Sequence, residues 1–178
     1  MKKSVLLLFF AGCVATGIFG IGRKIPMNRV NDLGQREGYW RDSVGGGFVY
    51  DLYYKGGKKD GLFKCFIRNE LFLFGEYTAD NISGTWYMFG DEGELRCTID
   101  SIEFNKDSIY TGYPCCRIFC KYKCYCADYY PSGAVKSEGY MVCDEEFEIE
   151  IWEIGEWKYY DESGNLIKTK DYGDRRTP

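Results

Sequence analysis

The 178-residue sequence contains no histidine, so the commonest general base of enzymes is missing. This absence excludes Ser-His and Cys-His nucleophile pairs and most histidine-based metallohydrolase sites. The chain also lacks a glycine-rich phosphate loop ending in Lys-Ser or Lys-Thr, and it lacks a nucleophile elbow. We therefore predict that the protein is not an enzyme and has no cofactor.

Concentrated positive charge is also missing. The chain has 23 Lys and Arg against 27 Asp and Glu, a net charge of −4, without a basic block outside the extreme ends. Nucleic-acid binding depends on a patch of Lys and Arg that faces the phosphates. We therefore expect no DNA or RNA partner.

The residues that are abundant favour β-structure. The sequence is 45% hydrophobic and 28% charged, which is typical of a globular chain. Sixteen Tyr, 12 Phe and 22 Gly favour short strands separated by turns over helices. The composition predicts an all-β fold.

The first 22 residues form a separate segment. Lys2 and Lys3 precede an apolar run from Val5 to Phe10 and then small residues, which is the layout of an export signal. Residues 23–37 have no hydrophobic period and are predicted to be a linker.

The sequence Phe10-Ala11-Gly12-Cys13 resembles a bacterial lipobox, in which the cysteine is lipidated. This interpretation predicts that Cys13 is the mature N-terminus of an envelope lipoprotein. Because the chain stays apolar to Ile21, residues 4–22 could instead be an uncleaved membrane anchor. An ordinary cleaved secretory signal is the third alternative, and a cytoplasmic location follows if the segment is no signal at all.

A motif of Gly, any residue and an aromatic ring recurs from residue 38 onward. The first three copies begin at residues 38, 61 and 84, so each starts 23 residues after the last. Such a period indicates stacked structural repeats over residues 38–172, followed by a tail at 173–178. The aromatic residues should form a core ladder between units: Trp40, Phe63, Trp86 and Trp157.

Turn sequences indicate that each repeat is a β-hairpin. Asp91-Glu92-Gly93, Pro131-Ser132-Gly133 and Asp161-Glu162-Ser163-Gly164 combine bend-favouring residues with a Gly that accepts positive φ. One hairpin alone is marginal in water, so successive hairpins should join in one sheet. The predicted fold is an elongated antiparallel meander.

The segments Gly84–Leu95, Tyr129–Tyr140 and Gly155–Leu166 resemble MORN-type repeats (membrane occupation and recognition nexus). Gly155–Leu166 has the form Gly-x-Trp-x-Tyr-Tyr-x-x-x-Gly-x-Leu, and Tyr129–Tyr140 fits as the second half of a unit. This form is similar to a bacterial branch often labelled as antitoxins. The resemblance implies an elongated sheet of hairpins and a role in protein or membrane contacts, and the family offers no shared catalytic residues.

Cysteines concentrate between Cys115 and Cys126, where they alternate with polar residues as on one strand. On such a strand Cys116 and Cys120 lie about 13 Å apart, too far for joint zinc ligation at ~2.3 Å. We therefore predict no metal site within this strand. Candidates for disulfides in an oxidising envelope, or else for buried thiols, are Cys65, Cys97, Cys115, Cys116, Cys120, Cys124, Cys126 and Cys143.

Three functions agree with these features. The first is a non-catalytic scaffold, tethered to the bacterial envelope by a lipid or anchor, that contacts a partner protein or the envelope surface. The second is an antitoxin or immunity protein that neutralises a toxin. The third is a disulfide- or metal-dependent role of the cysteine-rich strand.

Overall fold

The computed structural model describes residues 26–106, 110–111, 118–143 and 151–173. These residues form an all-β protein with one 12-stranded antiparallel sheet and a separate 2-stranded ribbon. Within the described residues, no helix is long and apolar enough to span a membrane. The predicted elongated meander of β-hairpins is confirmed.

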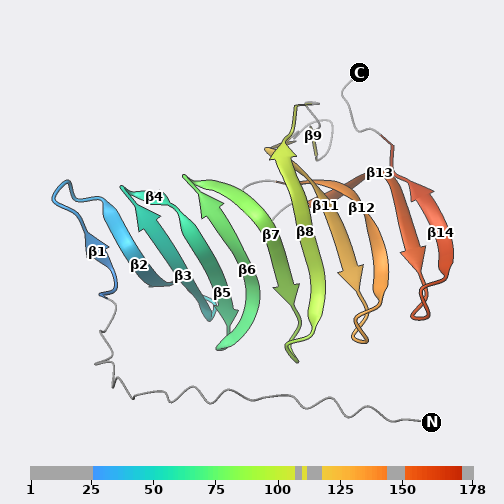
Figure 1. Ribbon diagram of the computed structural model, residues 1–178, viewed down its shortest axis with the longest axis horizontal. Coiled ribbons are helices and arrows are strands. Elements are labelled where there is room, and N and C mark those ends of the chain that lie inside the picture. Colours follow the sequence, from blue (N-terminus) through green and yellow to red (C-terminus); the bar gives the residue numbers. More distant parts are fainter. Residues whose placement is uncertain (1–25, 107–109, 112–117, 144–150, 174–178) are drawn as a thin grey trace, which may run out of the picture.

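Strands that follow one another in the sequence are neighbours in the sheet, with β8 passing directly to β11 and β4 pairing with β3 (Figure 1). The strands are β1 (Arg29–Val30), β2 (Arg36–Ser43), β3 (Phe48–Lys55), β4 (Lys58–Lys59), β5 (Gly61–Ile67), β6 (Glu70–Thr78), β7 (Asn81–Phe89), β8 (Leu95–Phe104), β9 (Tyr110–Thr111), β10 (Ile118–Phe119), β11 (Tyr122–Tyr129), β12 (Val135–Cys143), β13 (Ile151–Tyr160) and β14 (Leu166–Asp171).

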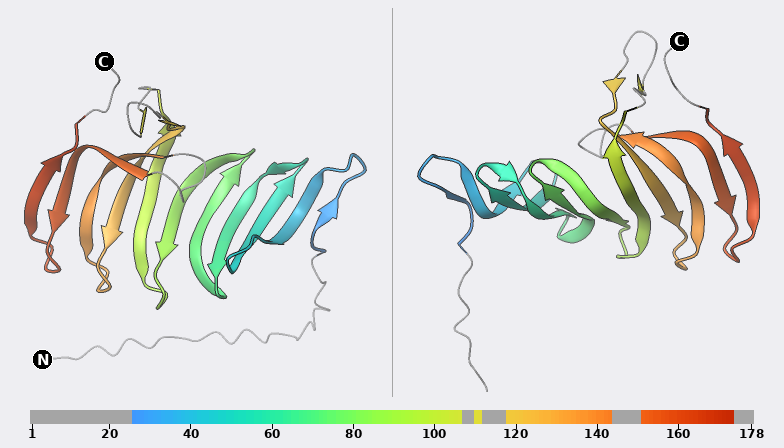
Figure 2. Two further views of the ribbon diagram at one scale, coloured as in Figure 1. Left: turned by 180° about the vertical axis from the view of Figure 1, so that it is seen from behind. Right: turned by 45° about the horizontal axis from the view of Figure 1, so that its top comes forward.

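The sheet is one long curved layer, and the ribbon of β9 and β10 stands beside one of its rims (Figure 2). Side chains alternate between two faces, as they must on strands. We call the face that carries the main buried cluster the core face, and the opposite one the outer face. The core-face cluster runs from Leu52 to Trp157 and includes Trp86, Ile99 and Met141, so one continuous core follows the sheet.

Two of the Gly-x-Trp copies, those beginning at Gly84 and Gly155, form β-bulges. On β7, the four steps from Ser83 to Tyr87 face only two steps from Glu76 to Phe74 on β6. Gly84 sits in this bulge at φ 65°, a left-handed conformation that favours glycine. Gly155 on β13 repeats the arrangement at φ 60°.

The bulges place each Trp ring over a glycine of the neighbouring strand. A Cβ added at Gly75 would lie 2.1 Å from the Trp86 ring, and one at Gly139 would lie 2.5 Å from the Trp157 ring. The indole N–H of Trp86 donates to the carbonyl oxygen of Ser83 at 3.1 Å. The glycines therefore make room for rings that are buried and hydrogen-bonded.

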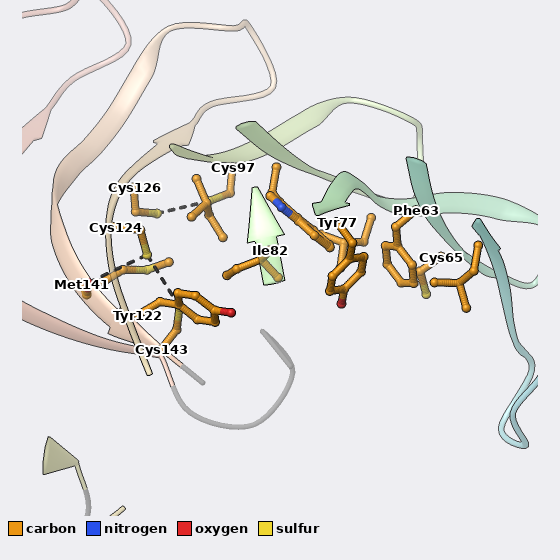
Figure 3. Packing of buried hydrophobic residues seen from close by; sticks show 14 of the residues in the cluster. Phe63, Cys65, Tyr77, Ile82, Cys97, Tyr122, Cys124, Cys126, Met141 and Cys143 are labelled. Atoms are coloured by element: carbon orange, nitrogen blue, oxygen red, sulfur yellow. Dashed lines mark hydrogen bonds between the residues drawn. The ribbon is translucent and has the colours of Figure 1, made fainter. Parts of the chain in front are cut away.

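The structure buries three of the four aromatic residues expected in the core ladder. Phe63, Trp86 and Trp157 are less than a tenth exposed, whereas Trp40 is half-buried at the start of the sheet. Phe63 and Trp86 have ring centroids 5.4 Å apart, and Tyr77 adds an edge-on contact with Trp86 at 5.3 Å. Adjacent repeats thus pack ring against ring through Phe63 and Trp86. Within one repeat, Tyr77 lies beside Phe63 (Figure 3).

The three predicted turns occur where the sequence places them. Each is closed by the amide of its glycine, which donates to a carbonyl three residues earlier: Gly93 to Gly90, Gly133 to Tyr130, and Gly164 to Asp161. All three glycines have positive φ, between 78° and 84°. Local turn chemistry therefore sets these hairpins.

The sheet begins before residue 38, inside the segment expected to be a linker. Arg29–Val30 form β1, which pairs with β2. The Asn31 side chain closes the intervening turn by accepting hydrogen bonds from the amides of Leu33 and Gln35. This segment is therefore structured by a turn that a side chain stabilises, although its sequence has no hydrophobic period. The export-signal residues lie outside the described residues.

The cysteine-rich stretch is not one strand. β11 begins only at Tyr122, and Cys120 packs with Val142 and Ile154 in a second, smaller cluster. Asn105 fixes the chain here, because its side chain donates to the Cys120 carbonyl at 2.8 Å. The predicted alternation holds from Tyr122 to Cys126, whose even-numbered side chains are buried on the core face.

Candidate functional site

A pocket of about 370 Å³ opens on the core face beside β8, β11, β12 and β13. Its wall also includes Trp157 and Lys136. What distinguishes this pocket is a concentration of sulfur and carboxylate groups: Met88, Cys97, Cys126, Met141, Asp128 and Glu153. We call it the thiol pocket.

Two of the pocket cysteines face each other across neighbouring strands. Cys126 on β11 pairs with Ile99 on β8, so it lies diagonally across from Cys97 on the same face. The two Sγ atoms are 3.2 Å apart. The hydrogen bond with Cys97, followed by burial, raises the pKa of the Cys126 thiol.

Asp128 completes a group of three donors. It lies directly opposite Cys97 in the register, and one of its carboxylate oxygens and the two sulfurs all lie within 4.8 Å of one another. The hydroxyl of Ser137, on the next strand, donates to Asp128 Oδ2 at 2.8 Å. Three rigid strands therefore position the two thiols, the carboxylate and its hydrogen-bond donor.

A second thiol pair lies deeper in the core. Cys124 on β11 and Cys143 on β12 bring their Sγ atoms to 3.7 Å, and both residues are fully buried. The hydrogen bond with Cys143, followed by burial, raises the pKa of the Cys124 thiol. Figure 3 shows both sulfur pairs side by side on the core face.

These environments disfavour thiol catalysis. The thiolate is the nucleophilic form of cysteine, and a raised pKa leaves the thiols of Cys124 and Cys126 protonated near neutral pH. Both residues are also at most 5% exposed. As protonated, buried thiols, Cys124 and Cys126 are poor nucleophiles.

The candidate cysteines divide into described and undescribed ones. The described ones are all buried: Cys65, Cys97, Cys120, Cys124, Cys126 and Cys143. Cys13, Cys115 and Cys116 lie outside the described residues. The disulfides stay a prediction, for which the structure brings two pairs into sulfur contact.

Sequence reasoning missed Asp128 as a partner of the cysteines. The Cys126-Ala127-Asp128 spacing puts both functional groups on one face of a strand, and this was the available signal. Cys97 lies far away in the sequence, and only the pairing of β8 with β11 brings it to them.

The outer face carries a different chemistry, built from aromatic pairs. Tyr39 and Tyr53 have ring centroids 5.5 Å apart, and Tyr125 and Tyr140 have centroids 5.2 Å apart. The Lys123 ammonium lies 5.3 Å from the Tyr140 ring centroid. Burial, followed by a hydrogen bond with a neighbouring carboxylate, raises the pKa of Tyr125 to about 12.

Comparison with known proteins adds no identification. No protein-family model, curated protein or solved structure matches this chain. The resemblance to MORN-type repeats therefore stays a prediction that rests on the repeated motif.

Proposed function

We propose that this protein is a non-catalytic repeat scaffold that contacts a partner protein through its outer face and is tethered to the bacterial cell envelope by its N-terminal segment. The observation that supports contact is the row of solvent-accessible tyrosine pairs on the outer face. Tyr53 and Tyr140 are 39% and 46% exposed, although each already packs against another ring.

Tyrosine pairs beside cations have the properties of a protein-binding surface. Tyrosine and arginine are enriched at protein interfaces, because a ring offers a large apolar area at low entropy cost and its hydroxyl still hydrogen-bonds. Arg41 on the outer face lies 5.8 Å from the Phe66 ring centroid, and Lys123 stands over Tyr140. Because both tyrosine pairs lie on the same face of one continuous sheet, one extended partner can contact both at once.

Site-specific photocrosslinking in intact cells tests the contact surface. We expect a photoreactive phenylalanine analogue at Tyr53 or Tyr140 to give the same discrete protein adduct. The matched control is Leu33, which is 81% exposed in the first hairpin turn and away from the tyrosine pairs. Adducts at Leu33 equal to those at Tyr140, or none at either tyrosine, would contradict a contact surface on the outer face.

Metabolic lipid labelling tests the tether. We expect wild-type protein to take up label and to sediment with membranes, and Cys13→Ser to lose both together, because lipidation requires the cysteine thiol. A single acyl chain alone binds membranes only marginally, so two or more chains are needed for stable retention. Unlabelled wild-type protein in the soluble fraction would rule out the lipoprotein and direct attention to the antitoxin alternative.

A further inference from the structure

The thiol pocket contains the donor set of a transition-metal site. Cys97 Sγ, Cys126 Sγ and an Asp128 oxygen lie within 4.8 Å of one another. Two thiolates and one carboxylate suit zinc, which takes sulfur and oxygen ligands in tetrahedral geometry. From these distances we infer that Cys97, Cys126 and Asp128 bind one zinc ion on the core face.

The spacing of the two sulfurs fits an ion between them after a small movement. A tetrahedral ion ~2.3 Å from each sulfur holds the sulfurs about 3.8 Å apart. Cys97 and Cys126 start at 3.2 Å, so a separation of roughly half an ångström suffices. Because each sulfur is on a different strand, side-chain rotation supplies this without disturbing the sheet.

The surroundings supply what a zinc site requires beyond its ligands. Ser137 donates a hydrogen bond to Asp128 Oδ2 at 2.8 Å and so fixes the carboxylate orientation. The pocket gives an ion a route of entry and leaves a fourth coordination position for water or for Glu153, which lines the same wall.

The neighbouring thiol pair provides an internal comparison. Cys124 and Cys143 are also in sulfur contact, at 3.7 Å, but they are absent from the three-donor group. The geometry therefore assigns zinc to one cysteine pair and not to the other. The site lies on the core face, so it does not depend on the contacts proposed for the outer face.

Zinc titration of the reduced, chelator-stripped, full-length protein tests this site. We expect one Zn²⁺ per chain and a rise in Tm of about 5 °C at saturation, because an ion that binds only the folded state stabilises it. Cobalt(II) in place of zinc should give a thiolate-to-metal charge-transfer band. Cys97→Ser and Cys126→Ser should each weaken binding at least about 100-fold, and Asp128→Asn about tenfold.

Three further variants separate a metal site from a general structural role. Cys124→Ser removes a buried thiol from the neighbouring pair and should leave zinc affinity within about twofold. Ser137→Ala should weaken binding about tenfold through loss of carboxylate orientation, and Ser137→Thr, which keeps a hydroxyl, should restore it.

Several results would overturn the site. They are absence of zinc binding by the reduced wild-type protein, unchanged binding in Cys97→Ser, an equal loss in Cys124→Ser, and a Cys97–Cys126 disulfide in protein isolated from its own host. Where a cysteine variant does not fold, alkylation mapping of the wild-type protein decides instead. Zinc should then protect Cys97 and Cys126, and protection no greater than at Cys124 would refute the assignment.

Discussion

Trp86→Ala should lower the free energy of unfolding by about 3 to 5 kcal/mol, the range found when a large buried aromatic side chain is truncated. Trp86 is 1% exposed and packs against Phe63 and Tyr77, with ring centroids 5.4 and 5.3 Å away. Truncation leaves a cavity between two repeats and removes the indole hydrogen bond to Ser83. The substitution therefore removes packing contacts that join β5, β6 and β7.

Urea unfolding followed by tryptophan and tyrosine fluorescence measures this effect. The matched control is Leu166→Ala on β14, where the side chain is 55% exposed and truncation should change stability by no more than about 0.5 kcal/mol. Equal urea midpoints for Trp86→Ala and wild type would show that the Trp86 ring does not stabilise the core.

Gly75→Ala should destabilise the protein by about 3 kcal/mol or more, although it adds a single methyl group. The new Cβ would lie 2.1 Å from the Trp86 ring, a separation that real atoms do not adopt. The ring cannot retreat, because the Ser83 carbonyl and two neighbouring aromatic rings hold it in place. Thermal and urea unfolding should both show the loss.

Gly90→Ala is the matched control. A Cβ at Gly90 would meet the Glu94 carboxylate at 2.0 Å, yet that carboxylate ends a flexible side chain that can swing away. Neither Gly75 nor Gly90 has positive φ, so backbone strain does not distinguish the two substitutions. They differ mainly in the group that the new methyl contacts, a fixed ring at Gly75 and a flexible carboxylate at Gly90. A second check combines Gly75→Ala with Trp86→Ala, whose costs should be far from additive because both act on one contact. Additive costs would contradict the ring-over-glycine packing.

The hairpin meander is predictable from the sequence because the signals that specify it are local. Turn residues select hairpins, alternation selects the buried face, and the 23-residue step between Gly38, Gly61 and Gly84 indicates repeated units. The predicted linker, residues 23–37, extends too far, because the sheet already begins at Arg29. The β1 hairpin depends on the Asn31 side chain and its turn, and not on a hydrophobic pattern.

The structure also changes how the cysteines are understood. The alternation of residues predicts one strand from Cys115 to Cys126. Instead, β11 begins at Tyr122, and Cys120 packs in a separate cluster. The three donors of the proposed zinc site come from two strands, Cys97 from β8 and Cys126 and Asp128 from β11. The donors meet because register, which sequence spacing does not reveal, sets Asp128 opposite Cys97.

An all-β chain of hairpins, the turns that join them, and the glycine and tryptophan positions that mark the units can all be predicted from local sequence. These features depend on backbone conformations and side-chain periods that extend over a few residues. The glycines beneath Trp86 and Trp157, and the cysteines that meet, are known only from the folded sheet. Those contacts depend on strand register and on bulges, and a shift of one residue would move every side chain to the other face.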